Sequence, residues 1–283
     1  MSIVVEKLTH TYMGGSSIAF SAIKDIDLTV YEGEFLGIIG HTGSGKSTLI
    51  QHLNGLIQPT SGKVTVDGFD MHDKKQRAQG RKLVGMVFQY PEYQLFEETV
   101  AKDIAYGPRN MGPKEPEIAV RVKEAMHLVG LDANRFANKS PFELSGGEKR
   151  RAALAGIIAM NPKYLVLDEP MAGLDPLGRK EILNTIDSLR KSINCSVVMV
   201  SHSMDDVARC ADRIAVLSGG ELICVDETQG VFEKTQMLLD AGLDVPQVSR
   251  LALLLRQRGV NIDEGIYKLD DMVRFIKGRV RHV

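Results

Sequence analysis

The chain has 283 residues, of which 43% are hydrophobic and 25% are charged, so it can bury a core and differs from a disordered chain. Its 35 Lys and Arg residues balance 36 Asp and Glu residues, and a net charge of -1 disfavours nucleic-acid binding. The longest apolar run, at residues 152–160, is far shorter than the roughly 20 residues of a membrane helix. Because the first residues also lack a signal-peptide pattern, a cytoplasmic location is expected.

The beginning of the chain predicts an antiparallel β element. Residues 3–8, 27–30 and 63–66 alternate apolar and polar side chains, and glycine-containing turns join them. Continuous runs rich in Ile, Val and Leu then recur between helical patterns. These runs lie at residues 35–39, 83–88, 164–167, 197–200 and 214–217. Runs of this kind are typical of parallel strands buried on both faces, so the sequence predicts an α/β fold with a mostly parallel sheet.

Two segments depart from this alternation. Between about residues 92 and 162 the strand signals fade, and helical spacing at 116–129 and 148–160 predicts an inserted helical subdomain. After residue 228 the composition shifts to helices with a polar face, among them one with Val248, Leu251 and Leu255 at helical spacing. We therefore divide the chain into a domain of residues 1–228 and an appended region of residues 229–283.

A phosphate-loop pattern follows the first parallel strand. Residues 40–47 fit GxxxxGK[ST] and precede a helical run at 48–57. Glycines in such a loop let backbone N–H groups converge on phosphate oxygens at a helix N-terminus. Lys46 is expected to contact the β- and γ-phosphates and Ser47 to ligate magnesium. The candidate nucleotide-binding residues here are Gly40, His41, Thr42, Gly43, Ser44, Gly45, Lys46, Ser47 and Thr48.

Another apolar strand, at residues 164–167, ends in two carboxylates. Strand alternation predicts that Asp168 and Glu169 point to opposite sides. Asp168 is expected to approach magnesium through a water molecule, and Glu169 to act as general base on the attacking water. His202 follows a later strand and is expected at the same sheet edge, near the γ-phosphate. Taken alone, these residues also fit a helix-capping acid and a solvated loop histidine.

A short motif in the helical insert identifies the family that the chain resembles. Leu144 is followed by Ser145, Gly146, Gly147 and Glu148, directly before a strong helical pattern. The order of phosphate loop, LSGG[QE] and Asp-Glu strand resembles the ATP-binding cassette family from about residue 3 to residue 229. The resemblance implies the cassette ATPase fold, and it implies that the motif meets the γ-phosphate of ATP held by another subunit. Ser-x-x-Glu is also a capping box, and many family members have Gln in place of Glu148.

Other positions match the family one by one. Tyr12 resembles the aromatic residue that stacks on adenine. Gln89 resembles the glutamine that contacts magnesium and the attacking water, in a loop that faces the membrane subunit. Residues 172–175 resemble the loop through which two ATPase subunits meet. The basic run at residues 149–151 is interpreted as a solvated helix face.

Finer features resemble energy-coupling factor importers of vitamins and metal ions. Residues 89–96 resemble their QxPExQ(L/I)F loop, residues 40–62 resemble the second of their two paralogous ATPases, and residues 229–283 resemble a subunit-pairing extension. The resemblance implies ATP and Mg²⁺ as cofactors and a second ATPase subunit, either a paralogue or an identical copy. It also implies the transmembrane energy-coupling subunit EcfT, a substrate-binding membrane S subunit, and a peripheral position on the cytoplasmic face of the cell membrane.

Other classes of cassette protein share some of these motifs. The ATPase of another importer, such as a cobalt or nickel system, shares the core motifs. Cassettes of DNA repair need coiled coils or zinc modules between motifs, whereas here only 99 residues separate Lys46 from Ser145 and 23 separate Ser145 from Asp168. Tandem translation factors need two phosphate loops, and this chain has one. A cassette that binds ATP without hydrolysis is disfavoured by the intact Glu169 and His202.

Overall fold

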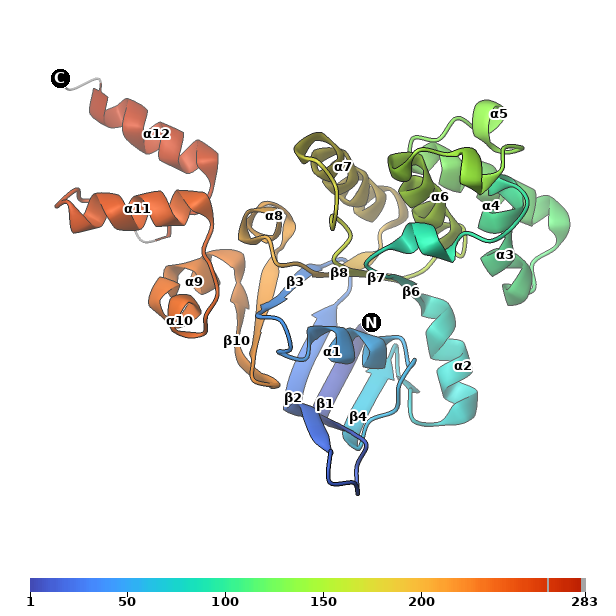
Figure 1. Cartoon of the computed structure of the whole chain (residues 1–283), viewed down its shortest axis with the longest axis horizontal. Helices are drawn as coiled ribbons and strands as arrows, with labels where there is room; N and C mark the ends of the chain where they lie inside the picture. The colour runs from blue at the N-terminus through green and yellow to red at the C-terminus, as the bar shows by residue number, and fades with distance from the viewer. Residues whose placement is uncertain (264, 281–283) are drawn as a thin grey trace.

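The computed structural model describes residues 1–263 and 265–280 and arranges the strands of these residues in two sheets (Figure 1). The strands are β1 (Ser2–Tyr12), β2 (Phe20–Tyr31), β3 (Phe35–Gly40), β4 (Ser61–Val66), β5 (Phe69–Asp70), β6 (Val84–Val87), β7 (Tyr164–Asp168), β8 (Ser196–Val200), β9 (Arg213–Ser218) and β10 (Glu221–Glu227). One sheet is antiparallel with the order β2-β1-β4-β5. The other has the order β10-β9-β3-β8-β7-β6 and is parallel except for β10 at one edge.

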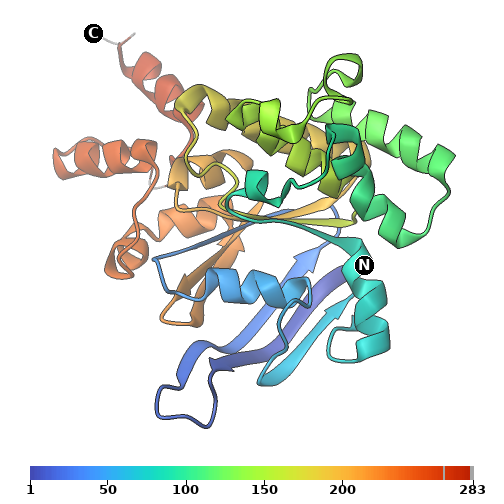
Figure 2. The same ribbon diagram turned by 45° about the vertical axis from the view of Figure 1, so that its right-hand side comes forward.

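Helices cover the parallel sheet and form a separate group beyond β6. They are α1 (Lys46–Leu53), α2 (Lys74–Leu83), α3 (Val100–Met111), α4 (Glu115–Leu128), α5 (Ala133–Phe136), α6 (Gly146–Ile158), α7 (Pro176–Ile193), α8 (Met204–Cys210), α9 (Thr228–Glu233), α10 (Thr235–Asp240), α11 (Gln247–Gln257) and α12 (Leu269–Val280). Two short 3₁₀ helices, η1 (Pro91–Gln94) and η2 (Pro141–Glu143), flank α3–α5. Helix α1 lies between the two sheets (Figure 2).

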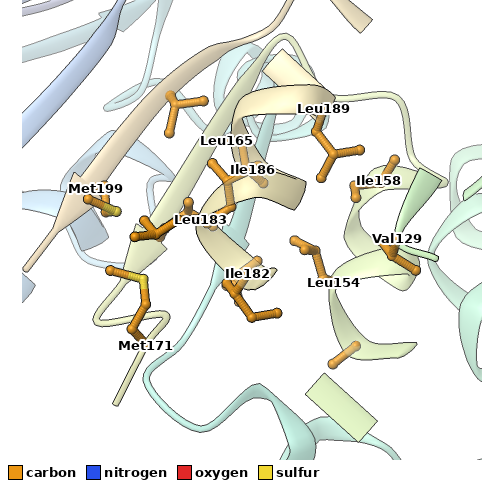
Figure 3. Close-up of a cluster of buried hydrophobic side chains, with 14 of the residues drawn as sticks. Val129, Leu154, Ile158, Leu165, Met171, Ile182, Leu183, Ile186, Leu189 and Met199 are labelled. Carbon is orange, nitrogen blue, oxygen red and sulfur yellow. The ribbon is translucent and has the colours of Figure 1, made fainter. Parts of the chain in front are cut away.

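The parallel strands are hydrophobic throughout because both of their faces are buried. In β7, Leu165 and Leu167 pack on the face covered by α7 and the helical subdomain, whereas Tyr164 and Val166 pack toward α1 and the antiparallel sheet. Figure 3 shows Leu165 and Met199 beside Leu183 and Ile186 of α7, with Leu154 and Ile158 of α6 on the far side. This packing joins the inserted helices to the sheet that carries the site.

The predicted α/β architecture is confirmed, although several element bounds differ. Strands β1 and β2 extend beyond the predicted segments, because their antiparallel pairing continues to the pair Tyr12 and Phe20 through irregular register. Helix α1 ends at Leu53, short of the predicted residue 57, and Gly55 follows with a φ of 69° that leaves the helical region. Helix α3 and the edge strand β10 are additional to the predicted elements.

The region after residue 228 contains two kinds of packing. Helices α9 and α10 and the following loop contribute to the main core, through Val231, Phe232, Leu238, Leu243 and Val245. Helices α11 and α12 instead share a small separate core around Ala252, Ile262 and Met272. They project on the side of the molecule opposite α3–α6 (Figure 1). Residues 264 and 281–283 of the predicted appended region lie outside the described residues.

A hydrogen-bonded joint ties the antiparallel sheet to β7. The Tyr164 hydroxyl donates to Asp67 Oδ1 at 2.6 Å, and Lys163 Nζ donates to Asp67 Oδ2 at 2.7 Å. The Asp67 side chain is only 6% exposed, in the turn between β4 and β5. A buried carboxylate that loses one donor keeps its desolvation cost, so this joint contributes to stability.

We expect Tyr164→Phe to lower the free energy of unfolding by about 1–3 kcal/mol, because it leaves Asp67 Oδ1 without its donor. Urea unfolding of the full chain measures this difference. Tyr93→Phe is the matched control, since the Tyr93 side chain is 84% exposed and its loss of a hydroxyl should change nothing. Equal unfolding midpoints for both variants would contradict the role of the joint.

Candidate active site

A cavity of about 430 Å³ opens at the carboxyl edge of the parallel sheet. Parallel strands end at the same edge, so motifs that are far apart in the sequence converge there. The lining residues are Tyr12, Phe20, Ala22, Thr42, Gly43, Gly45, Lys46, Ser47, Thr48, Gln89, Asp168, Glu169, Val200 and His202. The structure therefore brings together most of the site residues predicted from the sequence. Gly40, His41 and Ser44 of the phosphate loop and the predicted residues of the helical subdomain do not line this cavity.

The phosphate loop joins the end of β3 to the first turn of α1. Gly45 has a φ of 99°, and a Cβ at this position would lie 2.6 Å from the Ala22 carbonyl oxygen, so only glycine fits. Lys46 is 6% exposed, and its Nζ donates to the carbonyl oxygens of Gly40 at 2.7 Å and His41 at 2.9 Å. Burial lowers the pKa of Lys46, and the charges of Glu169 and Asp168 act in the opposite direction. Ser44 is fully buried beneath the loop, with no hydrogen-bond partner for its Oγ among the described residues.

Both carboxylates predicted at the end of β7 line this cavity. They have different partners there, because Asp168 hydrogen-bonds the Ser47 side chain of α1 whereas the Glu169 carboxylate contacts His202 after β8. Glu169 has a φ of 50°, so the chain turns out of the strand at this residue. Burial raises the pKa of Asp168, while a hydrogen bond with the Ser47 side chain lowers it.

Glu169 and His202 are direct neighbours in the site. Glu169 Oε2 accepts a hydrogen bond from the His202 backbone N–H at 3.3 Å, and Oε1 lies 3.3 Å from His202 Nε2. Burial raises the pKa of Glu169 to about 7. Burial and the positive charge of Lys46 lower the pKa of His202, so its ring is neutral near pH 7. A carboxylate with a pKa near neutrality is suited to take a proton from water.

Two aromatic residues border the cavity at the end of the β1–β2 ribbon. Tyr12 and Phe20 are cross-strand partners and are 40% and 59% exposed. The Tyr12 hydroxyl lies 3.3 Å from Thr48 Oγ1. Sequence reasoning missed Phe20, because it ended the first strand at residue 8 and began the second at residue 27. Continuing the strand pattern to both ends of the ribbon would have paired the two aromatic residues.

The LSGGE motif lies outside the cavity. Ser145 caps α6, because its Oγ accepts from Glu148 N–H at 3.4 Å and Glu148 Oε2 accepts from Ser145 N–H at 2.8 Å. The predicted capping box is thus present, and the Ser145 backbone hydrogen bond lowers the pKa of Glu148. A Cβ at Gly146 would meet no described atom within 4 Å. Glycine in a helix costs about 1 kcal/mol relative to alanine, and packing within the described chain does not require it at this position.

The basic run after this motif differs from its predicted role. Arg150 is 4% exposed, and its guanidinium donates to both carboxylate oxygens of Glu92 and to the carbonyl oxygens of Pro170 and Ala172. The interpretation of residues 149–151 as a solvated face is therefore wrong for Arg150. Consecutive helical residues point about 100° apart, so three adjacent positions cannot share one face.

The oxygen donors of the cavity suit a small divalent cation. Ser47, Gln89 and Asp168 all line it, and they offer hydroxyl, amide and carboxylate oxygens. The described residues contain no cluster of three or more His, Cys, Asp or Glu that could hold a metal ion by itself. Mg²⁺ usually keeps several waters and takes few protein ligands beside substrate phosphates, so this donor set fits it.

The fold and the site define the class of protein. The family of ABC transporters matches residues 23–172 of this chain. Among solved structures, cbiO1 from Clostridium perfringens, part of the ABC transporter complex cbiONQ, is 34% identical and superposes with a TM-score of 0.75 over 90% of this chain and 98% of its own. A dimeric ATP-binding cassette, MJ0796, bound to ADP and Pi is 29% identical with a TM-score of 0.70, over 80% and 98% of the two chains. The chain belongs to the ABC transporter family and is an ATP-binding ATPase of that family.

Curated relatives narrow the comparison further. The energy-coupling factor transporter ATP-binding protein EcfA2 of Clostridium perfringens (strain 13 / Type A) is 54% identical over 95% of both chains. The EcfA2 protein of Clostridioides difficile (strain 630) is 51% identical over 99% of both chains. These relatives confirm the resemblance to the second paralogue of energy-coupling factor ATPases.

We expect Lys46→Ala to weaken ATP binding roughly ten- to 100-fold, the range for losing a hydrogen bond to a charged group. The reason is that it removes the buried cation of the phosphate loop. Isothermal titration calorimetry with ATP measures the change. Lys191→Ala is the control, because the Lys191 side chain is 73% exposed on α7. An unchanged affinity in Lys46→Ala would remove the phosphate loop from ATP binding.

Proposed function

We propose that this chain is the ATP-hydrolysing subunit of an energy-coupling factor importer and couples ATP binding and hydrolysis to uptake of vitamins or other micronutrients. The observation that best supports this function is the separation of two motifs in the chain, the phosphate loop and the LSGGE signature of residues 144–148. The phosphate loop and Glu169 share a cavity, whereas the exposed signature at Ser145 lies on α6 outside it. A cassette with this division completes its site only when a second ATPase subunit supplies the signature.

The chemistry assigns a role to each group of residues. Tyr12 stacks on adenine, and residues 40–48 bind the phosphates through backbone N–H groups and Lys46. Glu169 accepts the proton of the attacking water, while His202 holds the carboxylate in place and contacts the γ-phosphate. Ser47, Gln89 and Asp168, the last through a water molecule, would hold Mg²⁺, which supplies neutralising charge to the phosphates.

The signature residues act across the pair. Ser145, Gly146, Gly147 and Glu148 stand at the N-terminus of α6, where helix N–H groups and the helix dipole favour an anion. The exposed glycines let the other subunit approach closely. In the head-to-tail pair, each signature contacts the γ-phosphate bound by the opposite phosphate loop, and closure excludes water. The partner ATPase is a paralogue or a second copy of this chain.

A second cavity supports docking on a membrane subunit. It measures about 650 Å³ and lies between α2, β6, α3 and α6, beside residues 89–96. Phe96 and Tyr106 line it and are 58% and 49% exposed, and Arg81 and Lys82 add positive charge. An apolar groove with a polar border fits an amphipathic helix. We assign it to a cytoplasmic segment of EcfT, with the S subunit contributing substrate selectivity through EcfT.

This assignment places the chain peripherally on the cytoplasmic face of the cell membrane. Within residues 1–263 and 265–280, the structure contains no helix of the length and apolar character that a membrane crossing requires. The alternative is the ATPase of another ABC importer, such as a cobalt or nickel system, and cbiO1 of the ABC transporter complex cbiONQ is 34% identical to this chain. The higher identity to EcfA2 proteins, 54% and 51%, favours the energy-coupling factor class.

The division into residues 1–228 and 229–283 guides a deletion test of subunit pairing. We expect removal of residues 247–283 to weaken the ATPase pair, because α11 and α12 expose Leu254 and Leu269 at 50% and 67%. The cut follows Pro246 because Val231 and Phe232 belong to the main core. Analytical ultracentrifugation with the partner ATPase measures pairing, and the unfolding midpoint checks the remaining core. Equally tight pairing of a folded truncated chain would give the extension another role.

The proposed base is tested by Glu169→Gln. This variant cannot accept a proton, so we expect hydrolysis in the assembled complex to fall roughly 10²- to 10⁴-fold while ATP affinity is retained. Wild-type hydrolysis should rise with pH through about 7, since Glu169 is active only after it loses its proton. The residual rate of Glu169→Gln should lack this rise.

Asp168→Asn serves as the comparison variant. It disturbs the Ser47–Asp168 oxygen pair, so it should weaken binding of Mg-ATP itself rather than hydrolysis alone. Stopped assays measure the hydrolysis rate over pH 5.5 to 8.5, about 1.5 units on either side of the expected midpoint. Calorimetry measures Mg-ATP affinity, so the two methods separate a loss of hydrolysis from a loss of binding. Hydrolysis at the wild-type rate by Glu169→Gln would mean that a residue other than Glu169 is the general base.

A further inference from the structure

Arg150 connects two loops of different function. Its Nε and Nη2 face the Glu92 carboxylate at 3.1–3.3 Å, and Glu92 belongs to η1 within the loop of residues 89–96. Its Nη1 donates to the carbonyl oxygens of Pro170 at 3.2 Å and Ala172 at 2.9 Å. These carbonyls lie in the turn that begins directly after Glu169.

The connection is buried and stiff. The side chains of Arg150 and Glu92 are 5% and 21% exposed, so solvent screens their interaction little. A guanidinium is planar and presents its donors in a fixed fork. The nitrogens that contact Glu92 and the Nη1 that donates to Pro170 and Ala172 therefore move together. A displacement of Glu92 shifts Nη1 and, with it, the hydrogen bonds to these two carbonyl oxygens.

The turn held by Arg150 is itself compact. Ala172 N–H donates to the Glu169 carbonyl oxygen at 3.0 Å, and Leu174 N–H donates to the Met171 carbonyl oxygen at 3.2 Å. The same loops also lie close together at Gly173, where an added Cβ would be 3.9 Å from Tyr90 Cε1. The position of this turn affects both the backbone of Glu169 and the loop at residues 172–175.

We propose that Arg150 is a positioning residue that transmits movement between the loop of residues 89–96 and the turn after Glu169. It acts through Glu92 on one side and through two backbone carbonyls on the other, without touching nucleotide. This inference rests on the proposed function, since it assigns the loop a membrane partner. If Arg150 only stabilised the fold, its substitution would lower stability but would not change how movement passes between the two loops.

The chain contains no tryptophan, so one can be introduced as a specific probe. Tyr93→Trp places it in the loop of residues 89–96, where the Tyr93 side chain is 84% exposed. The probe is combined in one full-length chain with Glu169→Gln, which retains bound ATP. Addition of ATP to this double variant should change the tryptophan emission. We expect Arg150→Met to abolish this change and Glu92→Gln to reduce it.

Two further variants test whether the response needs the hydrogen bonds of Arg150 to both loops, rather than only its positive charge or the stability of the fold. Arg150→Lys keeps the charge but cannot hold the carboxylate and both carbonyls at once, so its response should also be lost. Arg121→Met removes an Arg–Glu ion pair of α4 at 2.7 Å that lies outside these loops, and its response should remain. Glu92→Gln keeps a hydrogen-bond acceptor and tests the link even if Arg150→Met does not fold. An ATP response that is absent with Arg150 and Glu92 intact, or unchanged in Glu92→Gln, would overturn the inference.

Uptake by the assembled complex tests the consequence for transport. We expect uptake per ATP hydrolysed to fall at least about fivefold in Glu92→Gln, the lower end of typical coupling between sites, at unchanged ATP affinity. An unchanged ratio would contradict the inference. If wild-type complexes hydrolyse ATP without uptake while the probe responds normally, the proposed transport function fails and the Arg150 link stands.

Discussion

Burial of the central parallel sheet on both faces is the constraint on which the rest of the structure depends. Strands β3, β7 and β8 are enclosed by α1 and the antiparallel sheet on one face and by α7 and the inserted helices on the other. These strands are buried along their length apart from the partly exposed Asp168, so polar residues concentrate just beyond their carboxyl ends. The phosphate loop, Asp168, Glu169 and His202 meet there for this reason, although more than 150 residues separate the first from the last.

Backbone conformation at the edge then decides what these residues can do. Glu169 has a positive φ and lines the cavity with its carboxylate against His202, and burial raises the pKa of Glu169 to about 7. A left-handed conformation at a glutamate costs energy and persists only where surroundings impose it. The hydrogen bond from His202 and the turn held by Arg150 provide such surroundings.

Helix α6 of the inserted helices carries residues for two different contacts. The N-terminus of α6 carries the exposed signature, while Arg150, one turn further along, is buried and holds loops from both sides. Because a helix is rigid over this distance, the signature, the loop of residues 89–96 and the turn after Glu169 are mechanically related. Under the proposed function, nucleotide, partner ATPase and membrane subunit would therefore act on a connected set of residues rather than on separate sites.

Much of this architecture was predictable from sequence. The apolar runs indicated the parallel strands, and the phosphate loop, LSGGE and the Asp-Glu strand indicated the family, because each motif is local and has a local physical reason. The contact of Glu169 with His202, the pairing of Phe20 with Tyr12 and the buried ion pair of Arg150 with Glu92 were not predictable. Each depends on where a strand stops or on which distant segment packs against a helix, and such long-range contacts have no local sequence pattern. Only the tertiary structure decided them.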